Sequence, residues 1–172
     1  MRNSHRPGPP AHSKTEVLFA CALIVWASNS FAGDDLRVPD DFNGLVKSID
    51  AEEMRDWMKN ETEFIVLDVR TEKEFRKDGR APDSVLHPYT MKKKKRQQNL
   101  EFLRDVAEQF DKSETLVVLC SHGMRATQAA WELQEKEGFE NVYVFSGGFE
   151  GHHMSGYPAG DGWKAAGLPM ED

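Results

Sequence analysis

The sequence predicts an α/β fold in which helices cover both faces of a parallel sheet. Three short apolar runs, at residues 64–67, 116–119 and 142–145, have the length and composition of buried strands. Segments with apolar residues at helical spacing separate these runs. Strands that alternate with helices in this way are typical of a parallel sheet.

Length and composition indicate a single globular domain. The 172 residues are enough for a single core and too few for two. Hydrophobic residues make up 39% of the chain and charged residues 30%, as in many soluble globular proteins. The net charge of −7 argues against nucleic acid as a partner.

The N-terminus has the pattern of a secretory signal. A basic start precedes an apolar run of 11 residues at 17–27, and Ser30 and Ala32 form a small-x-small cleavage pattern. We therefore expect a signal peptide at 1–32, a lead-in segment at 33–47 and a single domain at 48–172. A buried first helix or an uncleaved anchor remains the alternative.

Cleavage would affect both location and cysteine chemistry. The mature protein would be periplasmic or secreted, with no membrane span. It would lose Cys21 and keep Cys120 as its one cysteine, so it could form no internal disulfide. A lone thiol in an exported protein is open to oxidants, which favours a reactive role for Cys120 over a packing role.

Capping patterns place several further elements. Asp50 begins a predicted helix to about Lys59, and Thr71 with Glu74 forms a capping box for a short helix that ends before Gly79. Other predicted elements are a brief strand at 85–86, an amphipathic helix at 97–110, a helix from about 126 to Gly138, an inserted loop at 152–161 and a terminal helix. The basic run 92–96 is either a solvated loop or a docking site for an acidic partner.

The residues that most clearly suggest a reactive site are 120–125, which follow the second predicted strand. Ligands of parallel sheets bind beyond the carboxyl ends of the strands. Gly123 allows a tight curl, and the amides of such a curl form an anion cradle with the next helix N-terminus. This setting and the charge of Arg125 favour a thiolate at Cys120. These local features leave open a buried, inert cysteine.

The pattern Cys120-x-x-Gly123-x-Arg125 resembles the active-site loop of the rhodanese family. Three further segments resemble family signatures in the expected order: Leu67-Asp68-Val69-Arg70-Thr71-x-x-Glu74-Phe75, the strand and glycine turn at 138–149, and the final helix at 162–169. The resemblance extends from about residue 42 to residue 172.

The resemblance implies a parallel sheet of about five strands and a sulfurtransferase that needs no cofactor. Cys120 would take sulfur from thiosulfate, a persulfide or a polysulfide as a persulfide, and pass it to a thiol, cyanide or a partner protein's cysteine. The expected site residues are Cys120 and Arg125 as catalytic groups, Ser121, His122, Gly123, Met124 and Arg70 as substrate-binding groups, and Asp68 as structural support of the loop. Arg70 has the alternative of pairing with Glu74, four residues on.

Other functions remain open beside the enzyme. A sulfur carrier or docking module would use the same cysteine without turnover. Related phosphatases and arsenate reductases have five residues between the loop's cysteine and arginine, whereas Cys120 and Arg125 are separated by four, which favours sulfur chemistry. Ser121, Met124 and Ala126 make the loop less basic than in thiosulfate-preferring enzymes, so we expect thiosulfate to be a poor substrate. The adjacent His152 and His153 point different ways, and we predict no metal site there.

Overall fold

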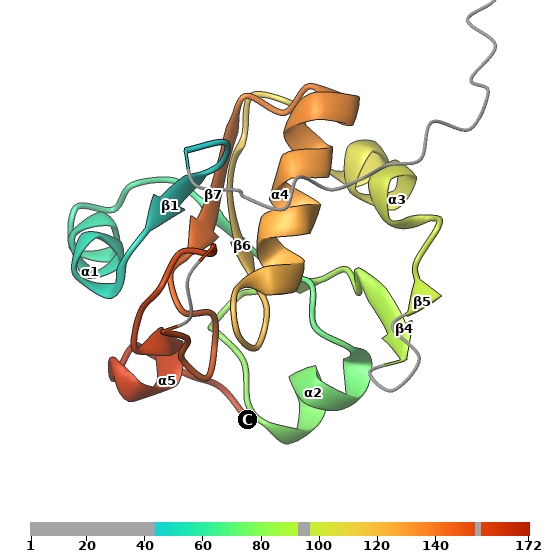
Figure 1. Cartoon of the computed structure of the whole chain (residues 1–172). Coiled ribbons are helices and arrows are strands. Elements are labelled where there is room, and N and C mark those ends of the chain that lie inside the picture. Colours follow the sequence, from blue (N-terminus) through green and yellow to red (C-terminus); the bar gives the residue numbers. More distant parts are fainter. Residues whose placement is uncertain (1–43, 93–96, 154–155) are drawn as a thin grey trace, which may run out of the picture. The chain divides into compact units, whose positions relative to one another are not determined.

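A computed structural model of the chain describes residues 44–92, 97–153 and 156–172 (Figure 1). The predicted signal peptide and nearly all of the predicted lead-in segment lie outside the described residues, as do residues 93–96 of the basic run. No helix within the described residues is long and apolar enough to cross a membrane.

A five-stranded sheet of order β1-β7-β6-β2-β3 forms the centre of the fold (Figure 1). Every neighbouring pair of its strands is parallel, as the alternation of strands and helices predicts. The strands are β1 (Lys47–Ile49), β2 (Ile65–Asp68), β3 (Val85–Leu86), β6 (Thr115–Leu119) and β7 (Asn141–Phe145). β6 is therefore the central strand, with a partner on each side.

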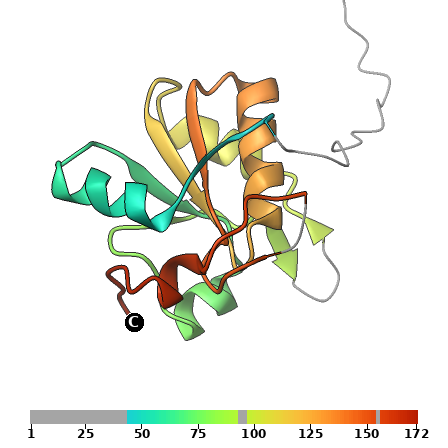
Figure 2. The ribbon, with the colours of Figure 1, turned by 60° about the vertical axis from the view of Figure 1, so that its left-hand side comes forward.

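Helices cover both faces of this sheet, as Figures 1 and 2 show. Leu116 and Val118 of β6 pack with α3 (Phe102–Gln109) and α4 (Met124–Glu137). Val117 and Leu119 pack on the opposite face with α1 (Ala51–Lys59) and α5 (Gly162–Ala165). The apolar run of β6 thus serves two cores, which is why it lacks the alternation of a half-exposed strand.

Two predicted helix starts are confirmed. The Asp50 carboxylate accepts hydrogen bonds from the backbone N–H groups of Glu52 and Glu53, each at 2.9 Å, at the start of α1. Thr71 and Glu74 form the predicted capping box of α2 (Glu72–Lys77). The box also orients the Glu74 side chain, because its carboxylate accepts the N–H of Thr71 at 3.0 Å.

The predicted helix at 97–110 is wrong in its first turns. Gln97–Gln98 form β5, which pairs antiparallel with β4 (Thr90–Lys92), and α3 begins only at Phe102. Leu100 fits the helical spacing but is 88% exposed, so its apolar character marks no core position. The Asn99 side chain accepts the N–H of Glu101 and forms a turn that separates the hairpin from α3.

The structure contains a strand that the sequence did not predict. β1 begins at Lys47, the last residue assigned to the lead-in segment, and pairs with β7 at the edge of the sheet. This strand has only one fully buried residue, Ile49. A run so short and so little buried carries no apolar pattern that would predict a strand.

Candidate active site

Cys120 is the first residue after the central strand β6, at the carboxyl end of the sheet. The chain turns sharply at Gly123, whose φ of 89° lies in the left-handed region, and α4 begins at Met124. Cys120 is only 1% exposed, and its Sγ atom accepts a hydrogen bond from the Ala126 N–H at 3.3 Å. The thiol therefore faces the inside of the loop at residues 120–125.

The backbone amides of this loop are available to a bound anion. Within the described part of the chain, the N–H groups of residues 121–125 donate no hydrogen bond to protein acceptors. Gly123, the N-cap of α4, has no side chain to cap the helix. Unpaired amides at the N-terminus of a 14-residue helix attract negative charge, which agrees with the anion cradle expected from the sequence.

A glycine turn after β7 packs against the loop and donates hydrogen bonds to it. The Phe149 N–H donates to the Cys120 carbonyl at 2.7 Å, and the Glu150 N–H donates to the Ser121 carbonyl at 2.8 Å. A Cβ atom at Gly148 would come within 2.5 Å of the Cys120 carbonyl oxygen and 2.8 Å of the His122 nitrogen. Only glycine therefore allows this turn to approach the loop so closely.

The inserted loop at 152–161 lies near the same turn. The Gly147 N–H donates to the Pro158 carbonyl at 2.9 Å, and His152 and Gly160 exchange two backbone hydrogen bonds at 2.8 Å. His152 is buried, whereas the neighbouring His153 is exposed. The Pro158 carbonyl oxygen lies 3.7 Å from the position of a Cβ atom at Gly123, so the insertion borders the Cys120 loop.

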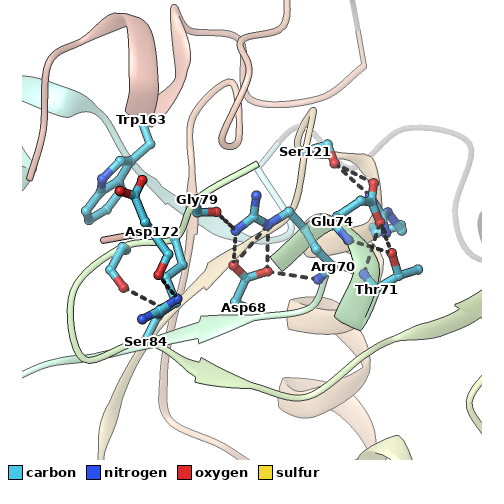
Figure 3. A network of polar contacts seen from close by, with 12 residues as sticks. Asp68, Arg70, Thr71, Glu74, Gly79, Ser84, Ser121, Trp163 and Asp172 are labelled. Carbon is cyan, nitrogen blue, oxygen red and sulfur yellow. Dashed lines mark hydrogen bonds and ion pairs between the residues drawn. The ribbon is translucent and has the colours of Figure 1, made fainter. Parts of the chain in front are cut away.

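Arg125 belongs to a closed network with Glu74 and Ser121, and Figure 3 labels the latter two. Its guanidinium donates to both carboxylate oxygens of Glu74, at 2.9 and 3.0 Å, and to the Ser121 Oγ atom at 2.9 Å. The Ser121 hydroxyl in turn donates to Glu74 at 2.8 Å. The network joins α2 to the loop across 51 positions of the sequence.

Glu74 and Arg125 both strongly favour their charged forms. Burial acts to raise the pKa of Glu74, but hydrogen bonds from Arg125 and Thr71 and the Arg125 charge outweigh it and hold the pKa well below the usual range. Burial acts to lower the pKa of Arg125, but hydrogen bonding to Glu74 and the negative charges of Cys120, Glu74 and Asp68 raise it. Arg125 thus lies within electrostatic reach of Cys120.

Arg70 occupies a different position from the one expected. Its guanidinium binds the Asp68 carboxylate at 2.7–3.0 Å and the Gly79 carbonyl at 2.8 Å (Figure 3), and it stacks 4.0 Å from the centre of the Phe149 ring. The side chains of Arg70 and Asp68 are 1% and 0% exposed. Pairing of Arg70 with Glu74 was the wrong alternative, because the buried guanidinium binds Asp68 instead. The expected role of Arg70 in substrate binding stays a prediction.

Asp68 supports the loop only indirectly. Among the described residues, the hydrogen bonds of its carboxylate go only to Arg70, through the backbone N–H at 2.9 Å and the guanidinium. Arg70 packs on Phe149, whose N–H binds the Cys120 carbonyl. The expected bracing by Asp68 therefore runs through Arg70 and the glycine turn.

The other predicted residues surround the thiol in different ways. His122 and Met124 are exposed at the rim of the loop, and Gly123 is buried at its turn. The Ser121 hydroxyl is bound to Glu74, so only its backbone N–H is available to a ligand. Sequence reasoning missed Glu74, Gly148, Phe149 and Thr127, whose hydroxyl donates to the Gly123 carbonyl at 2.9 Å. Glu74, Gly148 and Phe149 could have been found, because they belong to the segments at 67–75 and 138–149 that resemble family signatures.

A groove of about 790 Å³ lies away from the Cys120 loop. It includes Ile65 and Thr115, the first residues of β2 and β6, and hence lies at the amino end of the sheet. Cys120 follows the carboxyl end of the same strands. No residue of the Cys120 loop lines the groove, and the unpaired amides and the thiol identify the loop as the better candidate site.

The chain belongs to the rhodanese-like domain family, whose model matches residues 50–154. Among solved structures, it is similar to Rv0390 from M. tuberculosis, with a TM-score of 0.58 and 22% identity over 73% of this chain and 97% of that one. This likeness concerns the fold, and the match of the five-stranded sheet with flanking helices agrees with the fold expected from the sequence.

Curated relatives are similar over shorter stretches. The thiosulfate sulfurtransferase GlpE of Actinobacillus pleuropneumoniae is 36% identical over 64 residues, which are 37% of this chain and 48% of that protein. The mitochondrial protein HIGH ARSENIC CONTENT 1 of Arabidopsis thaliana is 36% identical over 96 residues, 55% of each chain. The chain thus spans about half the length of the curated relatives that it matches.

Proposed function

We propose that this protein is a sulfurtransferase that carries sulfane sulfur as a persulfide on Cys120. The observation that carries the proposal is the loop itself: a buried thiol faces a curl whose amides at 121–125 have no acceptor in the described protein, at the N-terminus of α4. Membership of the rhodanese-like family and the name of the GlpE relative support the same reaction class.

The first half-reaction forms the persulfide. The Cys120 thiolate attacks the outer sulfur of thiosulfate, the new S–S bond forms, and the old S–S bond breaks with its electron pair leaving on sulfite. A persulfide or polysulfide donor reacts in the same way and releases a thiolate or a shorter polysulfide. The free amides of the loop stabilise the negative charge of the persulfide, because their donors are already oriented.

The second half-reaction discharges the sulfur. Cyanide attacks the outer sulfur and leaves as thiocyanate, or a thiol attacks and leaves as a new persulfide, and the Cys120 thiolate is regenerated. Splitting the transfer into two displacements at one nucleophile is covalent catalysis. Arg125 lies within electrostatic reach of Cys120, so its positive charge attracts the anionic groups that react there in both steps.

A turnover assay with the Cys120→Ser variant tests this function. Thiocyanate formation from thiosulfate, or from an alkyl persulfide, and cyanide should be abolished in Cys120→Ser, because a serine hydroxyl forms no persulfide. The variant should lose only about 1 kcal/mol of stability, as serine is close in size. Phosphatase activity on an aryl phosphate, without persulfide formation, would contradict the proposal. Sulfur loading without turnover would instead identify a carrier or docking module.

We further propose export of the protein, on the N-terminal pattern alone. The basic start, the apolar run at 17–27 and the small residues before Gly33 support removal of 1–32 and a periplasmic or secreted location. Intact mass of protein from its native host should begin at Gly33. A cytosolic chain that retains residues 1–32 would contradict export and leave the proposed chemistry untouched.

A further inference from the structure

The Arg125 charge in the Cys120 loop is opposed by a carboxylate at hydrogen-bonding distance. Glu74 accepts two hydrogen bonds from the guanidinium and one from Ser121, a member of the loop. The Glu74 side chain is only 6% exposed and that of Arg125 is 20% exposed, so water screens the pair weakly. A donor in the loop therefore feels both charges of the pair.

We infer that Glu74 is a specificity-determining residue that disfavours doubly charged sulfur donors in the Cys120 loop, so that the site suits singly charged donors such as alkyl persulfide anions. Each unit of negative charge on a donor is attracted by Arg125 and repelled by Glu74. Because these energies scale with the donor's charge, a dianion loses more from the presence of Glu74 than a monoanion does. This inference deepens the proposed function and depends on it.

The neighbouring ion pair supports this assignment. The Arg70 guanidinium is bound by Asp68 and by the Gly79 carbonyl, so its charge is compensated in the same way. Within the described residues, Arg125 is the arginine of the loop itself, and Glu74 is the carboxylate that binds it. The sequence of the loop also limits its positive charge, because Ser121, Met124 and Ala126 add none.

Two sulfur donors of nearly equal shape but different charge separate the effect of donor charge from other effects on the rate. Thiosulfate carries two negative charges and releases sulfite, whereas the methanethiosulfonate anion, CH₃SO₂S⁻, carries one and releases methanesulfinate. With either donor, the Cys120 thiolate attacks the outer sulfur and the S–S bond breaks toward the leaving group. The two leaving groups differ in intrinsic reactivity, so the informative quantity is the ratio of the two kcat/KM values in each variant.

Glu74→Gln is the decisive variant, with Glu72→Gln as its matched control. Glutamine can retain the capping box with Thr71 but removes the charge. Glu72 lies on the same helix and pairs with Arg76, but its side chain is 65% exposed. We expect Glu74→Gln to raise the thiosulfate to methanethiosulfonate ratio by about tenfold. Glu72→Gln removes the same charge and should change the ratio by less than about twofold.

A second variant keeps the test valid if Glu74→Gln folds poorly. Arg125→Gln removes the positive partner and leaves the Glu74 charge, so the same ratio should fall by about tenfold. A uniform loss of activity with both donors, at an unchanged ratio, is the signature of a merely structural role and would overturn the inference. Failure of the unaltered protein to take sulfur from either donor would instead refute the proposed function.

Discussion

The Asp68–Arg70 and Glu74–Arg125 pairs lie at the same end of the sheet but in different surroundings. Asp68 and Arg70 are two residues apart and almost fully buried, and Arg70 packs on the turn behind the Cys120 loop. Glu74 and Arg125 come from different elements, and their network includes Ser121 of the loop. The Arg125 side chain remains 20% exposed.

The difference shows how one kind of interaction serves two purposes. A pair sealed from water that touches only structural groups fixes the position of the glycine turn, and with it the backbone of the loop. A pair that borders the thiol sets the charge that a ligand meets. Loss of the first should therefore appear mainly in stability, and loss of the second mainly in the choice of sulfur donor.

Removal of each arginine should give the largest contrast between the pairs. Arg70→Met leaves the Asp68 carboxylate buried without its partner and should cost about 3–5 kcal/mol of the free energy of unfolding. Arg125→Met should cost only about 1–2 kcal/mol, because Glu74 keeps donors from Thr71 and Ser121. Urea unfolding of both variants measures the two costs. Equal costs would contradict the division of roles.

The glycine turn supplies the next contrast. Gly148 and Gly138 have similar left-handed φ values, 68° and 73°, but a Cβ atom at Gly148 meets the loop backbone whereas one at Gly138 meets nothing within 4 Å. Gly138→Ala should cost about 1 kcal/mol from backbone strain alone. Gly148→Ala should cost about 2 kcal/mol more and abolish sulfur transfer, because the loop must move. Similar melting temperatures and activities for the two variants would refute close packing of the turn.

The smallest effect concerns the pH dependence of the Glu74 pair. The folded-state pKa of Glu74 lies below its unfolded value, so the stability it contributes is present above the unfolded pKa, about 4.3, and is lost as the pH falls below it. Glu74→Gln should be less stable than the unaltered protein by about 2 kcal/mol at pH 7, and this gap should narrow below about pH 4.5.

Glu72→Gln provides the control for this pH profile. Its carboxylate pairs with Arg76 on the exposed side of the same helix, so its loss should cost less than about 0.5 kcal/mol at any pH. Denaturant unfolding between pH 3 and pH 7 measures both gaps. A Glu74→Gln gap that stays constant down to pH 3 would show that the carboxylate is not held in its charged form by Arg125.

Local patterns predicted most of the fold and the centre of the site. The apolar runs of β2, β6 and β7 and the Thr71–Glu74 capping box depend on near neighbours in the sequence, and all are confirmed. Leu100 misled the prediction of α3, because helical spacing does not reveal whether a residue faces the core. β1 was missed because three edge residues have no pattern of their own.

Most parts of the site that the sequence did not predict are contacts between distant segments. Glu74 binds Thr71 at the start of its own helix and also Arg125 in α4, and local spacing reveals only the contact with Thr71. Arg70 is a local exception, because it had a suitable carboxylate four residues on, but the strand end placed Asp68 closer. The approach of Gly148 to the loop likewise requires the sheet to be assembled, since β7 and β6 are joined through α4.

The persulfide on Cys120 is tested most directly by mass spectrometry of the protein after treatment with thiosulfate or an alkyl persulfide. We expect a gain of one sulfur atom per chain, located by peptide mapping on the peptide that contains Cys120 and lost again when cyanide is added. The Cys120→Ser variant should gain none. Sulfur found on Cys21 instead, or loaded equally by the Cys120→Ser variant, would contradict the assignment of Cys120 as the sulfur-carrying nucleophile.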